Sequence, residues 1–170
     1  FQPDKKYPPM ELYAIHPRDE LLMYAKEHVK KGVKTEVESF TTGAFWNIEW
    51  MRGLKDCPLQ DPIYTTLFMG WPGGAYTYPD MESMLNFYHH LPKNCVWNLS
   101  NMDPKTHWQN LSWAICLGGH VRVGWEDNPY IDGELTDSNA RLVEKIVRIA
   151  NDLGREIATP DEARKILNIK

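Results

Sequence analysis

The chain has 170 residues and a formal net charge of −4, from 19 Lys and Arg against 23 Asp and Glu. At roughly 150 residues per domain, this length predicts one domain with its own core. The mildly acidic balance contains no block of like charge, which argues against nucleic acid as the main partner. No apolar run approaches the roughly 18 residues that a membrane span requires.

Cysteine usage and the first residue add two constraints. Cys57, Cys95 and Cys116 are widely spaced, and an odd number of cysteines without a C-x-x-C pair predicts free thiols in a reducing, cytoplasmic compartment. The chain begins with Phe1 instead of Met, so we interpret it as processed or as part of something longer.

Hydrophobic periodicity and the positions of Pro and Gly predict alternating strands and helices. The Pro-rich residues 1–9 are expected to form an arm or loop. The expected elements are a helix at 17–29, a strand at 33–40, a short amphipathic segment at 48–54, a strand at 63–69, a helix at 79–88, a strand at 95–100, a helix from 103 to the glycines at 118 and 119, a strand at 120–125, a helix at 138–153 and a short helix at 163–169. Thr159 and Glu162 have the spacing of a capping box before the last helix.

The alternation indicates a parallel sheet, which fits a doubly wound sheet or part of a (β/α)8 barrel. Arg122 in the fourth strand separates the two, because both faces of a doubly wound sheet lie under apolar helices, where a charge is costly. A barrel strand instead turns one face to the lumen, and the polar pairs Glu36 with Glu38 and Asn98 with Ser100 agree with that arrangement. We therefore predict an α/β fold of the (β/α)8 TIM barrel class, of which this length holds about four of the eight units.

Adjacent acidic residues, Glu126 and Asp127, follow the fourth strand. The carboxyl ends of barrel strands form the catalytic face, so the two are candidates for a metal ligand and a general base, although a strand ending in turn-forming residues explains them equally well. Arg122 favours the functional interpretation, because a buried guanidinium requires a carboxylate partner. Strict alternation places Arg122 and Asp127 on opposite faces, so the strand must bend at Gly124 or end by Glu126 for them to meet.

Six stretches occur in an order and spacing typical of a known family. They are 36–40 with Gly43, 70–74, 118–128, 138–140, 153–155 and 158–164. Together they resemble the β-keto acid cleavage enzymes, among them the 3-keto-5-aminohexanoate cleavage enzyme of lysine fermentation, over nearly the whole chain from about Val33. By this resemblance residues 1–170 correspond to the C-terminal half of one TIM barrel, strands five to eight, with 1–16 as an N-terminal arm and 155–170 as a C-terminal tail helix.

The resemblance implies a zinc-dependent acyl transfer of the retro-Claisen type, carried out by an oligomer, expected to be a homotetramer. A β-keto acid condenses with acetyl-CoA, and the adduct splits into acetoacetate and a new acyl-CoA. Glu126 is implied as a zinc ligand, Asp127 as the base, and Arg122 as the residue that orients Asp127. The chemistry is reasonable, because zinc polarises a keto oxygen and a neighbouring carboxylate can take a proton from the methyl carbon of acetyl-CoA.

The resemblance also indicates substrate contacts. Glu38 fits the variable end of the substrate, with a hint of a polar or cationic tail, while Glu36 stays an alternative and either glutamate is a possible partner of Arg122. Gly73 can admit a CoA phosphate or pantetheine arm, because glycine lets a ligand approach the backbone, and Trp71 is a candidate pocket wall. A tight loop that binds nothing explains the same two residues equally well.

The sequence lacks the His-x-His pair that supplies further zinc ligands in this family. His89 and His90 are adjacent at a helix end, so their side chains diverge, and His120 lies at the opposite end of its strand from Glu126. Catalytic zinc sites use about three protein ligands, so the others are expected outside this chain, in a missing N-terminal half. The isolated chain, with two open strand edges, is expected to be inactive and poorly soluble. The alternatives are a non-catalytic α/β subunit without the metal site and, less well supported, a doubly wound nucleotide-binding domain.

Overall fold

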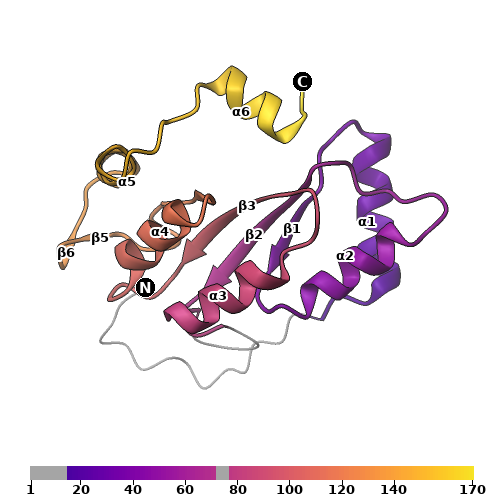
Figure 1. Cartoon of the computed structure of the whole chain (residues 1–170), viewed down its shortest axis with the longest axis horizontal. Helices are drawn as coiled ribbons and strands as arrows, with labels where there is room; N and C mark the ends of the chain where they lie inside the picture. The colour runs from indigo at the N-terminus through magenta and orange to yellow at the C-terminus, as the bar shows by residue number, and fades with distance from the viewer. Residues whose placement is uncertain (1–14, 72–76) are drawn as a thin grey trace.

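The computed structural model describes residues 15–71 and 77–170, which fold around a four-stranded parallel sheet with the order β1-β2-β3-β4 (Figure 1). The strands are Glu36–Ser39, Ile63–Met69, Cys95–Asn101 and His120–Val121. The helices are α1 Arg18–Lys30, α2 Ala44–Arg52, α3 Met81–His90, α4 His107–Cys116, α5 Asn139–Asp152 and α6 Pro160–Leu167. A hairpin of β5, Tyr130–Ile131, and β6, Glu134–Leu135, precedes α5. In this described part of the chain, no helix combines the length and the apolar character needed to cross a membrane.

One face of the sheet is polar at its centre. The parallel register places Glu38 beside Thr66, Thr66 beside Asn98, and Asn98 beside His120. Because side chains alternate along a strand, these four residues share a face, and Asn98 Nδ2 donates to Thr66 Oγ1 at 3.0 Å. The polar strand faces expected from the sequence are therefore present and are brought together by the register.

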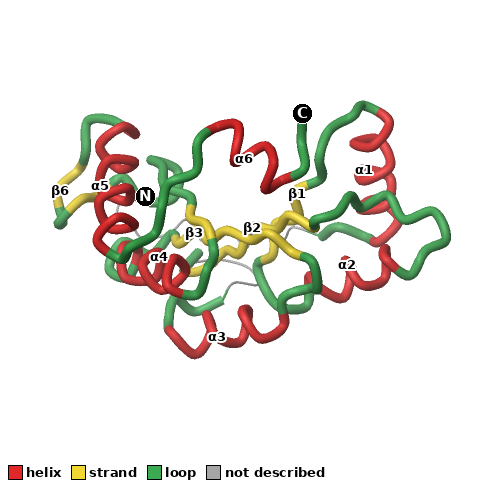
Figure 2. The backbone as a smooth tube through the Cα atoms, turned by 45° about the horizontal axis from the view of Figure 1, so that its top comes forward, coloured by secondary structure: helices red, strands yellow, loops and turns green. Residues whose placement is uncertain are grey.

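The opposite face of the sheet is apolar and carries the core. Figure 2 shows α2, α3 and α4 on that side of the strands. The buried core residues include Phe45, Ile48, Leu67, Met69, Met84, Phe87, Trp97, Leu99, Leu111 and Ala114, with Ile146 and Ala150 added by α5. Full burial of a large apolar side chain stabilises a fold by about 1.5–3 kcal/mol, so this layer is the main source of stability. One apolar and one polar face is the pattern of a barrel segment and differs from a doubly wound sheet, whose faces are both apolar.

Helix α6 lies on the polar side of the sheet, near the N-terminal ends of the strands (Figure 2). Ile166 and Leu167 of α6 line a small cavity together with Tyr64 and Val96 of the sheet. The predicted capping box begins this helix, since Thr159 Oγ1 accepts from Glu162 N–H at 3.3 Å and Glu162 Oε2 accepts from Thr159 N–H at 2.8 Å. A helix is thus present in the expected tail segment 155–170, but it spans Pro160–Leu167 instead of 163–169, because its first turn starts directly after the capping residue Thr159.

Several element boundaries differ from those expected. Helix α4 begins at His107 and not at Asp103, because Asp103 Oδ2 accepts from the N–H of Thr106 at 3.1 Å and from its hydroxyl at 2.6 Å, which closes a turn before the helix. Helix α2 begins at Ala44, four residues before the expected segment. Helix α3 begins at Met81 instead of 79, since the Asp80 side chain caps it, and the β5-β6 hairpin was not expected.

Candidate active site

The fourth strand ends early in a tight turn. It comprises only His120–Val121 instead of 120–125, and one further ladder bond joins Arg122 N–H to the Leu99 carbonyl at 2.9 Å. The carbonyl of Gly124 then accepts from the N–H groups of Asp127 and Asn128 at 3.1 and 2.9 Å. Strict alternation stops at this turn, so Asp127 folds back toward Arg122. Of the two ways for these residues to meet, the early end of the strand is the one observed.

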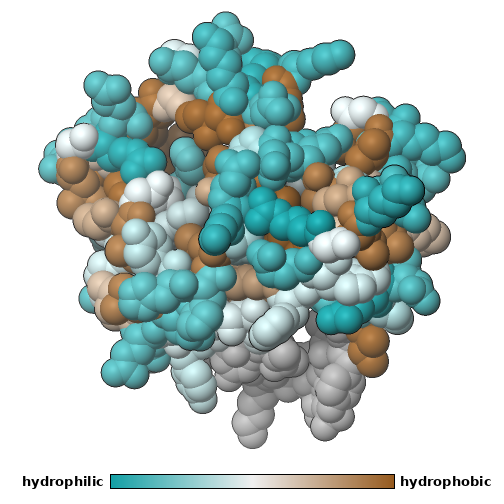
Figure 3. Space-filling view, turned by 45° about the vertical axis from the view of Figure 1, so that its right-hand side comes forward, coloured by the Kyte–Doolittle hydropathy of each residue, from teal (hydrophilic) through white to brown (hydrophobic). Residues whose placement is uncertain are grey.

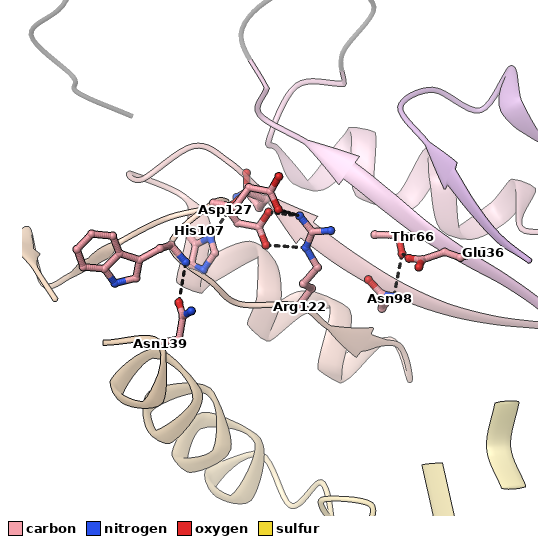
Figure 4. Close-up of polar contacts among 10 residues, drawn as sticks. Glu36, Thr66, Asn98, His107, Arg122, Asp127 and Asn139 are labelled. Atoms are coloured by element: carbon pink, nitrogen blue, oxygen red, sulfur yellow. Dashed lines mark hydrogen bonds and ion pairs between the residues drawn. The ribbon is translucent and has the colours of Figure 1, made fainter. Parts of the chain in front are cut away.

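Arg122 and Asp127 form a two-pronged ion pair (Figure 4). Arg122 Nε donates to Asp127 Oδ2 at 2.9 Å, and Nη2 donates to Oδ1 at 2.6 Å. The Asp127 side chain is 1% exposed and that of Arg122 is 34% exposed, so the carboxylate has exchanged water for the guanidinium. The hydrogen bond with Asp127 raises the pKa of Arg122. The pair holds the carboxylate in one orientation beside a permanent positive charge.

Glu126 makes a weaker contact with the same guanidinium. Its Oε2 lies 3.1 Å from Arg122 Nη2, but its side chain is 80% exposed. An exposed ion pair stabilises by about 0–1 kcal/mol, so Glu126 can exchange this contact for another at little cost. Glu126 and Asp127 therefore contact the same arginine, but Asp127 is held firmly and Glu126 only weakly.

The described residues do not fit a zinc ion on their own. Within 15–71 and 77–170, no group of three or more His, Cys, Asp or Glu side chains is placed to hold a metal. Glu126 is a single carboxylate whose nearest partner is Arg122, and a catalytic zinc site needs about three protein ligands.

The ion pair borders a pocket of about 370 Å³. Its lining residues are Glu38, Phe40, Phe68, Trp71, Met102, Arg122, Glu126 and Asp127. The rings of Phe40 and Phe68 stack at 4.6 Å between centroids, and Trp71 follows at 5.3 Å from Phe40. Arg122 Cζ lies 5.2 Å from the Phe68 ring centroid, a cation–π contact. The pocket thus has an aromatic wall and a charged wall that meet at Arg122.

The pocket distinguishes the two glutamates of β1. Glu38 lines it, whereas Glu36 accepts a hydrogen bond from the Thr66 hydroxyl. The hydrogen-bonded ion pairs of Arg122 in the described chain go to Glu126 and Asp127, so neither glutamate of β1 is its direct partner. Of the predicted site residues, Glu38, Trp71, Arg122, Glu126 and Asp127 come together, and Gly73 lies outside the described residues.

Charge crowding acts on Glu38. Partial loss of hydration in the pocket raises the pKa of Glu38, and the negative charges of Glu36, Glu126 and Asp127 raise it further. The positive charge of Arg122 lowers that pKa but does not compensate for the other effects. The pocket therefore disfavours its own negative charge and favours a cation near Glu38.

A buried histidine beside the ion pair was not expected as part of the site. His107 is fully buried at the start of α4, and its Nδ1 lies 2.6 Å from the carbonyl oxygen of Asn101 (Figure 4). Because a carbonyl only accepts, Nδ1 carries the proton of this bond. Burial lowers the pKa of His107, which favours the neutral ring. A single histidine has no ligand spacing, so the sequence pattern offered no signal for this position.

Other residues of the six stretches build the scaffold. Arg155 donates to the carbonyls of Ile115 and Gly118 at 3.4 and 3.2 Å and so satisfies the C-terminal end of α4. A Cβ atom at Gly119 would lie 2.4 Å from the ring of Trp97, so only glycine fits against this indole. Arg155 and Gly119 thus hold the end of α4 and the start of β4, the strand that Arg122 directly follows.

The sequence profile of the beta-keto acid cleavage enzymes matches residues 10–169. The chain belongs to this family. It is 39% identical over 149 residues to the 3-keto-5-aminohexanoate cleavage enzyme of Fusobacterium nucleatum, covering 86% of this chain and 52% of that protein. The enzyme of the same name from Acetoanaerobium sticklandii is 35% identical, with coverages of 91% and 55%. The 3-dehydrocarnitine:acetyl-CoA trimethylamine transferase of Rhizobium meliloti is 30% identical, with coverages of 85% and 47%. The chain thus spans about half the length of these relatives.

We expect Glu38→Gln to stabilise the protein at neutral pH. Because the pKa of Glu38 is raised in the folded state, its stabilising contribution is complete below the unfolded-state pKa of about 4.3 and is lost as the pH rises through the folded-state value. The neutral Gln avoids that loss, so its melting temperature should exceed that of the wild type at pH 7 and match it near pH 4. Glu134→Gln on the exposed β6 is the control. An equal shift at both pH values would contradict the assigned cause.

Proposed function

We propose that the chain provides the base and the charged wall of a β-keto acid:acetyl-CoA transferase. A β-keto acid and acetyl-CoA are converted to acetoacetate and a new acyl-CoA. The observation that carries the proposal is the Asp127 carboxylate, which is buried, gripped by Arg122 and placed at the edge of a pocket. Membership of the family supports it, as does the acetyl-CoA in the name of the Rhizobium meliloti relative.

The proposed enzyme is an assembly. Strands β1 and β4 are the outer strands of the described sheet, and such edges readily pair with further strands. We propose that four more strands close them into a (β/α)8 barrel, in which this chain is the C-terminal half and the polar face lines the lumen. This chain and those strands together form what we call the assembled enzyme.

Exposed hydrophobic residues are available for such contacts. Figure 3 shows a mainly hydrophilic face with hydrophobic residues at several separate places. Among the described residues, Met23 and Val29 of α1 and Trp46 of α2 are large and exposed. Contacts with the rest of the barrel and with further copies of the enzyme would cover such residues; the homotetramer stays a prediction.

The chemistry assigned to Asp127 is removal of a proton from a carbon next to a carbonyl group. A carboxylate is suited to this task when it is held within reach of the substrate and does not have to shed water first. Arg122 keeps the carboxylate in place through two hydrogen bonds, and Asp127 lines the pocket in which we place the substrate.

The carbon that leads to acetoacetate is the one between the keto and carboxylate groups of the β-keto acid, so Asp127 takes its proton there and not from the methyl carbon of acetyl-CoA. The carbanion attacks the thioester carbon of acetyl-CoA and expels the CoA thiolate. The thiolate then attacks the original keto carbon, the bond between that carbon and the former carbanion carbon breaks, and the acetoacetate carbanion takes the proton back as the new acyl-CoA forms.

The decisive test is Asp127→Asn in the assembled enzyme. The amide keeps the size of the carboxylate but is a poor base, so we expect acetoacetate formation to fall by roughly 100-fold to 10,000-fold. Asp152→Asn, at the exposed C-terminal end of α5, is the matched control and should keep full activity. Near-normal activity of the Asp127 variant would remove Asp127 as the base. A wild-type assembled enzyme without activity would favour a non-catalytic subunit.

The zinc ion implied by the resemblance requires ligands beyond the described residues. We propose that Glu126 supplies one of them, because its exposed carboxylate borders the pocket and is only weakly held. When bound, the metal would polarise the keto oxygen as a Lewis acid. The other ligands are assigned to the strands that complete the barrel.

Metal content tests this assignment independently of activity. We expect the assembled enzyme to contain zinc and Glu126→Gln to lose most of it, because a neutral amide is a much weaker ligand than a carboxylate. Elemental analysis after dialysis gives the zinc per chain, with Glu134→Gln as the control. Equal zinc in both variants would exclude Glu126 as a ligand.

Glu38 indicates the substrate class. We propose that it binds a cationic group at the tail of the β-keto acid, since the described lining of the pocket carries the acids Glu38, Glu126 and Asp127 and, of cationic side chains, only Arg122. A bound cation would lower the raised pKa of Glu38 and relieve its crowding with Glu36. The names of three relatives contain an amino or a trimethylamine group, in line with this proposal.

A comparison of two substrates tests the role of Glu38. Hydrogen bonds to charged groups contribute about 1.5–3 kcal/mol, so Glu38→Gln should lower kcat/KM for an amino-substituted β-keto acid by roughly tenfold to 100-fold. For a neutral substrate of equal length, kcat/KM of the Glu38→Gln variant should fall by less than about threefold, because that substrate makes no charged contact with residue 38. An equal loss of kcat/KM for both substrates would mean that Glu38 does not recognise the positive charge of the substrate.

A further inference from the structure

One side chain ties the turn that carries Asp127 to helix α5. Asn139, the first residue of α5, accepts a hydrogen bond through Oδ1 from the backbone N–H of Trp125 at 2.9 Å. Figure 4 shows Asn139 reaching from α5 toward this turn, where its bond is separate from those of the ion pair. Asn139 does not line the pocket. Its contact is with the residue that directly precedes Glu126 and Asp127.

The turn requires an acceptor at this point. The Gly124 carbonyl takes the N–H groups of Asp127 and Asn128, as in a single turn of helix. The N–H of Trp125 lies at the start of that turn, where a helix likewise has N–H groups without an internal partner. An amide oxygen from Asn139 satisfies it in the way that a capping side chain satisfies the start of a helix.

Asn139 is not occupied by capping its own helix. The N-cap residue of α5 is Ser138, and no side-chain capping bond is present there. A second bond runs between the same two segments, because Trp125 Nε1 donates to Thr136 Oγ1 at 3.1 Å. The segment that leads into α5 thus holds both the backbone and the indole of Trp125.

We propose that Asn139 is a positioning residue for the Asp127 carboxylate. Arg122 on the sheet holds the carboxylate, and Asn139 on α5 holds the backbone of the turn, so Asp127 is fixed from two elements. Without Asn139 the ion pair persists, but the turn can pivot about it. A displacement of about 1 Å at a reacting group costs on the order of 100-fold in rate, so a loosened turn reduces turnover while the pocket keeps its lining. The proposal rests on the proposed role of Asp127 as the base.

The test compares three variants of the assembled enzyme. Asn139→Ala removes the acceptor, Asn139→Asp keeps an acceptor oxygen, and Asn151→Ala changes an exposed asparagine at the other end of α5. For Asn139→Ala we expect kcat for acetoacetate formation to fall roughly tenfold to 100-fold, with KM within about twofold of the wild type. Asn139→Asp should recover most of kcat, and Asn151→Ala should match the wild type.

Amide hydrogen exchange over residues 123–128 gives a readout that needs no activity. In Asn139→Ala the amide hydrogen of Trp125 should exchange faster than in the wild type. In Asn139→Asp and Asn151→Ala this amide should keep its protection. Unchanged kcat and unchanged exchange in Asn139→Ala would overturn the proposal. So would equal losses of kcat and melting temperature in the Ala and Asp variants, since those indicate a purely structural role. If the wild type forms no acetoacetate, the proposed function fails. The exchange data alone then show whether the hydrogen bond from Trp125 N–H to Asn139 holds the turn.

Discussion

A carboxylate removed from water needs a fixed positive partner, and the ion pair of Asp127 with Arg122 imposes this requirement on the chain around it. Breaking such a pair from one side costs about 3–5 kcal/mol, because a buried charge is left without compensation. The strand therefore cannot continue past Arg122 in regular alternation, which would carry Asp127 to the other face of the sheet. The turn at Gly124 resolves the conflict, and its bonds to Asp127 and Asn128 place the carboxylate over the guanidinium.

The same constraint explains why the sheet has one polar face. A guanidinium at the edge of an apolar layer needs polar or aromatic neighbours, and Arg122 has the Phe68 ring on one side and carboxylates on the other. Helices α2, α3 and α4, which supply much of the core, lie on the opposite face, so the charged groups do not compete with their apolar packing. Loss of hydration raises the pKa of Glu38, and the excess of negative over positive charge around it raises this pKa further.

Much of this arrangement was predictable from periodicity, and the remainder depended on bonds that periodicity does not contain. Strand β2 was predicted at its observed bounds because a short run of β-branched and apolar residues favours a buried strand. The polar faces of the strands followed from the alternation of side chains along each strand. The early end of β4 and the late start of α4 were not predicted, since each depends on a local acceptor, the Gly124 carbonyl or the Asp103 side chain. His107 was missed for a related reason, because its burial is set by tertiary contacts of a single residue.

Adjacent acids with one arginine need not do the same work. Asp127 is 1% exposed and takes two hydrogen bonds from Arg122, so moving it requires breaking a desolvated pair. Glu126 is 80% exposed and takes one, so it can leave Arg122 for another cation at almost no cost. A base has to stay in place, and a ligand has to turn toward whatever binds beside it. The difference in burial therefore matches the proposed division between a fixed base at 127 and an exchangeable ligand at 126, although both acids contact the same guanidinium.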